Sequence, residues 1–346
     1  AVWVNSTSGE TYVCTDATAG ANIWTNVGGG DGDVILYFYT GENYGYSIGR
    51  YAQAYLPDIS RYAFASSATG TDVGDLPSYQ HAGSGLSSST YGYHCGRYND
   101  PAGGQPSMIS KVSFASGVEA GVSAGDLTQG SYNQGGHNTA SYGYLAGGVI
   151  NHTPYVTTTM IQTVTFSSDG STDSGQDLRR SLKGMSAHQS LTYGYLAGGH
   201  YTSQSPVTDE IDKFQLATTN TSTNIGTLPG GNRTNGTNTG VSSSTEAYVI
   251  GGYHSQPASI TLIEKFSFTN EGSAWDVGDL AVKKSGATTT SETSYGYIHS
   301  GEASPPNYSY QNDIERFAYT SGNTNVSVAD IGTTVLAGAG GASAQF

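Results

Sequence analysis

Tyrosine and histidine side chains gather in the long segments of this 346-residue sequence, and these residues are the best suited to chemistry. Tyrosine rings stack on sugar rings or apolar surfaces, while phenol, imidazole and amide groups form hydrogen bonds. This chemistry predicts a surface that binds a carbohydrate or a protein; the alternative is that these loops only solvate the rim of a scaffold. The candidate binding residues are Tyr51, Tyr55, Tyr98, Tyr155, His200, Tyr201, Tyr253, His254, Tyr308 and Tyr310.

Sequence signatures of catalysis are absent. The chain has no His-Glu-x-x-His and no phosphate-cradling glycine loop. Its eight histidines occur singly, and Asp31-Gly32-Asp33, which has oxygens for Ca²⁺, is more often a turn. Cys14 and Cys95 are too few for a disulfide framework, and we expect buried free thiols. We therefore predict no catalytic residues, no metal and no cofactor.

The charge balance limits the partners. The net charge is −14 with only 13 Lys plus Arg, so no basic stripe is available to bind a nucleic-acid backbone. No apolar run approaches the roughly 18 to 20 residues that span a membrane, and we expect no membrane insertion. The chain begins at Ala1 without a signal peptide, and we expect a processed product or part of a longer chain.

A Tyr-Gly-Tyr word recurs along the chain and indicates the repeated structural elements that position these loops. Its second tyrosine falls at positions 46, 93, 144, 195, 248 and 297, so the gaps are 47, 51, 51, 53 and 49 residues. A period near 50 residues indicates the blades of a β-propeller. In the fifth copy the word is reduced to Ala247-Tyr248.

Two further words keep the same period. A Val-Gly-Asp-Leu word ends at Leu76, Leu127, Leu178, Leu228, Leu280 and Ile331. The other begins with Ile, usually has Lys or Arg two residues later, and alternates strictly, as expected of a strand with one buried and one polar face. Its copies are Ile59–Phe64, Ile109–Phe114, Ile161–Phe166, Ile211–Phe214, Ile263–Phe268 and Ile314–Tyr319.

These words predict an all-β fold, a propeller of four-stranded blades in one domain of residues 1–346. Each repeat reads as a small-residue first strand, the Tyr-Gly-Tyr second strand, the Ile-word third strand and the Val-Gly-Asp-Leu fourth strand. The loops between second and third strands emerge on the same face as the connections between blades. All ten candidate binding residues lie in those loops or at their edges.

The two ends of the chain predict how the ring closes. Six repeats occupy residues 31–331, and the distance from Val328 to Phe346 equals that from Val73 to Tyr91, so a first strand ends the chain. We expect residues 1–30 and 332–346 together to complete a seventh, closing blade, which would leave no open sheet edge. The alternative is six blades that close on their own, with a small separate N-terminal module.

The repeats resemble kelch repeats, whose blades carry a Gly-Gly pair after the second strand. Gly147-Gly148, Gly198-Gly199 and Gly251-Gly252 keep the pair, whereas Gly49-Arg50, Gly96-Arg97 and Ser300-Gly301 depart from it. The opening segment, residues 2–28, and the repeat words are similar to kelch-like propellers in virion proteins of marine tailed phages, notably cyanophages. The resemblance implies a virion surface component such as a tail fibre or a capsid decoration.

The leading functional hypothesis is a non-enzymatic virion structural protein whose long-loop face attaches to a host-surface glycan or protein, or decorates the capsid or tail. Other virion proteins are its expected partners, and we expect a homo-oligomer in the assembled particle. One alternative is a kelch-type oxidase or a glycan-active enzyme. Another is an extracellular lectin-like protein.

Overall fold

The computed structural model describes residues 2–4, 9–16, 23–28, 41, 43–51, 55–66, 68–98, 105–114, 120–201, 207–231, 233–234, 240–254, 259–303, 309–320, 326–331 and 340–344. These residues are all-β, in small antiparallel sheets with no helix. The chain divides into two compact units, residues 1–38 and residues 39–346.

The first unit holds one three-stranded sheet. Its strands are β1 (Val2–Val4), β2 (Thr11–Asp16) and β3 (Ile23–Gly28), paired in that order. The rings of Trp3 and Tyr12 lie 5.3 Å apart across the β1–β2 pair. Cys14 is only partly buried here, which corrects the prediction of a buried thiol, whereas Cys95 in the second unit is buried as predicted.

The described part of the second unit contains six four-stranded sheets, which we number in chain order by their second strands. The first strands are β33 (Gly340–Ala344), β7 (Ser84–Ser87), β11 (Gly135–Asn138), β17 (Ser186–Gln189), β22 (Gly240–Ser242) and β27 (Thr288–Ser291). The second strands are β4 (Tyr44–Tyr51), β8 (Tyr91–Cys95), β12 (Tyr142–Ala146), β18 (Tyr193–Ala197), β23 (Glu246–Ile250) and β28 (Tyr295–His299).

The remaining strands complete these sheets. The third strands are β5 (Tyr55–Ala63), β9 (Met108–Ser113), β15 (Met160–Thr165), β19 (Glu210–Gln215), β25 (Leu262–Ser267) and β31 (Asp313–Ala318). The fourth strands are β6 (Thr71–Asp75), β10 (Val122–Asp126), β16 (Gly170–Asp177), β20 (Thr223–Thr227), β26 (Trp275–Asp279) and β32 (Val326–Asp330).

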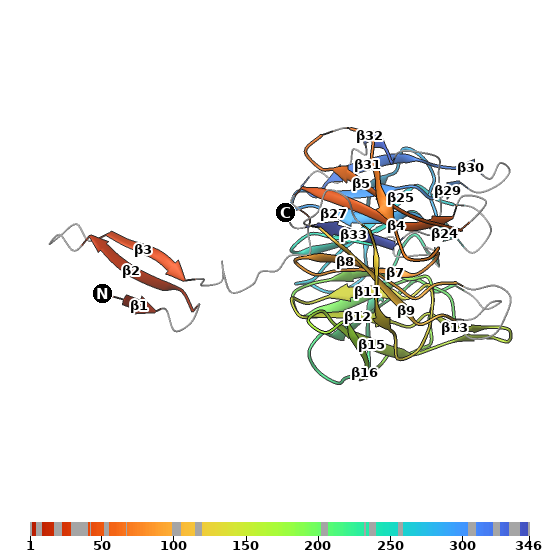
Figure 1. Ribbon diagram of the computed structural model, residues 1–346, viewed down its shortest axis with the longest axis horizontal. Helices are drawn as coiled ribbons and strands as arrows, with labels where there is room; N and C mark the ends of the chain where they lie inside the picture. Colours follow the sequence, from red (N-terminus) through yellow and green to blue (C-terminus); the bar gives the residue numbers. More distant parts are fainter. Residues whose placement is uncertain are drawn as a thin grey trace. The chain divides into compact units, whose positions relative to one another are not determined.

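Three two-stranded hairpin-like sheets decorate one side of this unit, and β13, β24, β29 and β30 are seen there in Figure 1. The pairs are β13 (Val149–His152) with β14 (Tyr155–Thr157), β21 (Arg233–Thr234) with β24 (Tyr253–His254), and β29 (Glu302–Ala303) with β30 (Ser309–Tyr310).

The chain end pairs differently from the prediction. β33 is a first strand, as its spacing indicates, but it pairs with β4, so that Ala342 lies opposite Tyr46. The strands of the first 30 residues form their own sheet without it. The closing blade predicted from residues 1–30 and 332–346 is therefore wrong, because the first repeat takes its first strand from the C-terminal segment. The division into units matches the alternative with a separate N-terminal module.

The first strands contact one another in a closed cycle. β33 contacts β7, and contacts continue through β11, β17, β22 and β27 back to β33. Side chains near the strand ends follow the same cycle. The Ser87 N–H donates to Asn138 Oδ1 at 2.9 Å, and the Asn138 N–H donates to Gln189 Oε1 at 2.6 Å. Ser242 and Ser291 accept the next two bonds with their hydroxyl oxygens.

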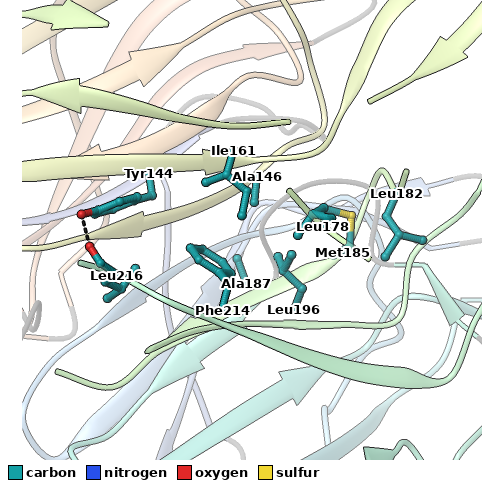
Figure 2. Close-up of a cluster of buried hydrophobic side chains, with 10 residues drawn as sticks. All are labelled: Tyr144, Ala146, Ile161, Leu178, Leu182, Met185, Ala187, Leu196, Phe214 and Leu216. Carbon is teal, nitrogen blue, oxygen red and sulfur yellow. Dashed lines mark hydrogen bonds between the residues drawn. The ribbon is translucent and has the colours of Figure 1, made fainter. Parts of the chain in front are cut away.

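The core lies between neighbouring sheets. Figure 2 shows one of its clusters, where side chains of the third sheet, including Tyr144 and Ile161, pack against Phe214 and Leu196 of the fourth. The glycine of the Tyr-Gly-Tyr word lets neighbouring sheets pack this closely, as the contact between the second and third sheets shows. A Cβ added at Gly143 would lie 2.4 Å from Leu86 Cδ1 in the neighbouring sheet. Gly147 and Gly148 then turn the chain into the loop with φ of 67° and 98°.

The third strands do not alternate as strictly as predicted. In β15 both Ile161 and the next residue, Gln162, are buried, because a bulge shifts the register between them. Buried polar side chains occupy the same place in the other sheets, including Asp212 and Glu264. They hydrogen-bond the chain entering from the preceding sheet: the Gln129 N–H donates to Gln162 Oε1 at 2.7 Å. Both faces of these strands are therefore packed.

Candidate functional site

The long loops and the connections between sheets meet on one face of the second unit, which we call the long-loop face. Isolated bridges join three of the connections to the loop of the following sheet, between Tyr132 and Val149, Lys183 and His200, and Ser285 and Glu302. In the first of these, the two N–H groups donate to each other's carbonyl at 3.1 Å and 2.9 Å. Loops from neighbouring sheets are thus held side by side, which lets distant segments share a surface.

Tyr98 and Tyr155 lie together, in a group of rings that we call the aromatic cluster. Tyr98 contacts Tyr132 with ring centroids 5.0 Å apart and His152 at 5.2 Å. His152 lies 5.5 Å from Tyr155, and its Nδ1 is 3.1 Å from the Tyr132 hydroxyl. His81 contacts Tyr98 from the connection before the second sheet. The cluster thus consists of His81, Tyr98, Tyr132, His152 and Tyr155.

The electrostatics of the aromatic cluster favour binding over proton transfer. Burial lowers the pKa of His81 to about 4, so this imidazole is neutral near pH 7. Burial also raises the pKa of Tyr155. Lys183 places its ammonium 4.7 Å from the centre of the Tyr155 ring, and burial lowers the pKa of this amine.

A second group continues this surface into the fourth sheet, and we call it the arginine clamp. The Arg179 guanidinium bonds Asp212 Oδ1 at 2.7 Å and Glu210 Oε2 at 2.8 Å. Arg180 bonds Glu210 and the Tyr201 hydroxyl, and stacks over the Tyr201 ring. Burial works to raise the pKa of Glu210, but its bonds and charge interactions with the two arginines outweigh burial and lower it.

The two groups touch through β14. The Thr157 hydroxyl donates to the Tyr201 carbonyl at 2.7 Å, joining the strand that carries Tyr155 to the loop that carries Tyr201. Tyr98, Tyr155 and Tyr201 therefore belong to one continuous patch across the second, third and fourth sheets. His200 lies at its edge, where its backbone bridges Lys183 and Val207.

The remaining predicted residues lie elsewhere or outside the described set. Tyr253 donates its hydroxyl to Glu302, and Tyr310 pairs with Glu302 along the backbone, so these two share a smaller site. Burial raises the pKa of that Glu302 carboxyl. Tyr51 and Tyr55 face each other in the backbone pairing of β4 and β5, and His254 pairs with Arg233, but their side chains are outside the description. Tyr308 and the Asp31-Gly32-Asp33 segment are outside it as well.

Sequence reasoning passed over His152 as a binding residue, although it lies at the centre of the aromatic cluster. A histidine two residues before a proline in a long loop carries no signal of its own. Tyr132, Arg180 and Lys183 lie in the connections between sheets, which the sequence predicted on the same face as the long loops. Their partners depend on which loops meet, which no single repeat reveals.

Comparison with known proteins adds no assignment. No family model matches the sequence, and no curated protein matches it. Among the described residues, no cluster of three His, Cys, Asp or Glu side chains could hold a metal ion. The described part of the chain also has no helix long and apolar enough to cross a membrane.

Proposed function

We propose that residues 39–346 form a six-bladed β-propeller that serves as an exposed, non-enzymatic binding module. Six four-stranded sheets with a 50-residue period support this architecture. So does the closed cycle of contacts from β33 through β27 and back. In such a ring, the C-terminal strand locks the first blade and joins the two ends of the unit.

The observation that carries the binding function is the continuous patch on the long-loop face. Its tyrosines are partly exposed and combine flat ring surfaces with hydroxyl groups, and Arg180 and Lys183 add cations beside them. Aromatic rings flanked by hydrogen-bonding groups bind sugar rings, and the cations favour sugars that carry carboxylate or another acidic group. The ligand class that fits is therefore a surface glycan with acidic substituents.

The setting that we propose is a virion surface, in a tail fibre or a capsid decoration, with other virion proteins as neighbours. The resemblance of residues 2–28 and of the repeat words to virion proteins of marine tailed phages supports this setting. The net charge of −14 also favours the solubility expected of an exposed surface protein.

A glycan array probed with the purified protein tests the binding function. Tyr155→Ala combined with Tyr201→Ala removes two rings of the patch, and we expect at least a tenfold loss of array signal and of competition with particles for host cells. Tyr44→Ala is the matched control, since that partly exposed tyrosine starts β4 at the other end of the strands. Unchanged glycan binding by a folded double variant would refute the long-loop face as the binding surface.

A further inference from the structure

In four of the six sheets, a cation of the third strand covers the first tyrosine of the second strand. Arg61 lies 4.5 Å from the centre of the Tyr44 ring, Lys111 4.7 Å from Tyr91, and Lys213 4.6 Å from Tyr193. Arg316 covers Tyr295 at 4.7 Å, and Lys265 pairs with Glu246, which replaces the tyrosine in the fifth sheet. The third sheet differs: Thr163 occupies the cation's register position, opposite Tyr144. Tyr142 is left 43% exposed.

At two of the junctions the neighbouring sheet adds both an acid and an aromatic ring to this cover. At the junction of the fourth and fifth sheets, Glu271 bonds Lys213 at 2.5 Å and Phe268 stacks on Tyr195 at 4.8 Å. At the junction of the second and third sheets, Asp169 bonds Lys111 and Phe166 stacks on Tyr93 at 5.0 Å. Both residues come from the turn between third and fourth strands, three positions apart.

At the junction of the third and fourth sheets, both of these residues are also replaced. Leu216 occupies the aromatic position and Thr219 the acid position, three residues later. Tyr144 has no ring stacked on it from that turn, and its hydroxyl donates to the Leu216 carbonyl, as Figure 2 shows. Thr163 and Leu216 differ from every other copy of the repeat, and Thr219 stands where the second–third and fourth–fifth junctions have an acid.

A pocket of about 840 Å³ lies at this junction. It is bounded by the turn at Thr139–Tyr142, by β15 and β16, and by the turn at Leu216–Thr219. These turns lie at the strand ends opposite the long loops, so the pocket is separate from the patch of the aromatic cluster and arginine clamp. Thr163, Leu216 and Thr219, which stand at the cation, ring and acid positions, all line it.

The lining selects a neutral, polyhydroxylated ligand. Eight of its fifteen residues are Ser or Thr, Asp173 is its single charged residue, and no Lys, Arg or His takes part, which disfavours an anionic sugar. Thr219 stands where two other junctions have an acid that pairs with the cation, which disfavours an amine. The partly exposed Tyr142 ring offers a stacking surface. Gln176, only 4% exposed, lines the pocket, and its Oε1 has no hydrogen-bond partner among the described atoms.

We propose that this junction pocket is a binding site for a neutral pyranose, stacked on Tyr142 and hydrogen-bonded by the surrounding hydroxyls. The site is distinct from the proposed long-loop site in position and in ligand charge. It turns one junction of a repeated scaffold into a sugar pocket by substitution of three residues.

The test rebuilds the cover found at the neighbouring junctions. Saturation-transfer NMR with methyl glycosides of galactose, glucose, mannose and N-acetylglucosamine should show contact of at least one with the wild-type protein. Thr163→Lys combined with Thr219→Glu should fill the pocket and abolish that signal without lowering Tm, and Tyr142→Ala should reduce it at least tenfold. Tyr295→Ala, at the same register position under Arg316, is the matched control and should retain the signal.

Three results would overturn the proposal: no glycoside signal at all, a signal that the Thr163→Lys, Thr219→Glu variant keeps, or preferential binding of tetramethylammonium, included as a cationic probe. The Tyr155→Ala, Tyr201→Ala variant separates the two sites. It should keep the neutral glycoside signal even where it loses the acidic glycan, so either proposal can fail alone.

Discussion

The junction of the third and fourth sheets and that of the fourth and fifth sheets have the same backbone pairing but different surfaces. The fourth–fifth junction is closed by Lys213, Glu271 and Phe268, which cover Tyr193 and Tyr195. At the third–fourth junction the equivalent residues are Thr163, Thr219 and Leu216, and a pocket is present. A repeat protein can thus differentiate one interface while the strand framework is unchanged.

We call the third–fourth junction the open junction and the fourth–fifth junction the closed junction. The open junction is held together at the end of the strands away from the pocket. The arginine clamp joins the connection that follows β16 to β19, the third strand of the fourth sheet. The Asp212 side chain is 3% exposed there. The buried contacts of Tyr144, Ile161 and Phe214 lie between the clamp and the pocket. Stability and binding are therefore separated along one interface, and variants can address each of them.

The largest effect is expected from the clamp. Arg179→Ala leaves the Asp212 carboxylate buried without its main counter-ion, which typically costs about 3 kcal/mol of unfolding free energy. Urea unfolding followed by fluorescence measures the change. Lys213→Ala is the control at the closed junction, where the acid, Glu271, is 30% exposed and not buried as Asp212 is, and the loss should stay below about 1 kcal/mol. Equal losses in the two variants would contradict the proposed difference between the junctions.

The next largest effect is the loss of stability at low pH that protonation of His137 causes. The His137 ring meets the Phe214 ring edge-on at the open junction, and its Nε2 lies 3.1 Å from the Tyr195 carbonyl. Burial lowers the pKa of His137 from 6.5 to about 4. The unfolded chain then binds the proton more readily than the folded chain. The free energy of unfolding is therefore unaffected by this histidine above pH 6.5 and decreases as the pH falls toward 4. At pH 5 this histidine should account for about 2 kcal/mol of that loss.

Thermal unfolding from pH 7 to pH 4 measures the acid effect. His137→Gln should show a shallower decline between pH 6.5 and pH 4 than the wild type, whatever its stability at pH 7. Subtracting the two curves removes the contributions of the other histidines whose pKa values burial lowers, His81, His94 and His299. Parallel curves would show that His137 does not titrate on unfolding.

The sequence predicted the strand order within each repeat, because the three words mark the second, third and fourth strands with a common period. The spacing also marked residues 340–344 as a first strand, but it assigned them to the wrong sheet. Spacing measures distance along the chain, whereas pairing depends on which edge strand lacks a partner, here β4. Tyr98, Tyr155 and Tyr201 were placed on one face correctly, yet their contacts depend on loops from three repeats.

The junction pocket was also missed, although the sequence contains its signal. The third residue of the Ile word is Thr163 where the other copies have Lys or Arg, and Leu216 stands where the other turns have an aromatic residue. Each departure alone resembles ordinary variation. Only contact between the third strand of one sheet and the turn of the next shows that they affect the same volume.

Opening the closed junction should have a smaller effect on stability. Lys213→Thr, Phe268→Leu and Glu271→Thr copy the open junction into the fourth–fifth interface. The stacked ring contributes about 1 kcal/mol and the partly exposed ion pair about 0.5 kcal/mol, so we expect a loss of about 1.5 kcal/mol. The same NMR experiment should detect a second glycoside contact. A stable triple variant without added binding would mean that the lining threonines of β15 and β16 are also required.

The smallest effect is expected from closing the open junction. Thr163→Lys with Thr219→Glu adds a cation over Tyr142 and a partly exposed ion pair, which together should stabilise the fold by about 0.5 kcal/mol. Chemical unfolding of the variant and of each single change gives the coupling between the two new residues. The pocket would then be retained at a cost to stability, as expected of a binding site. A loss above 1 kcal/mol would instead show that the Thr163 position does not superpose on that of Lys213, and that the two junctions differ in backbone as well as in side chains.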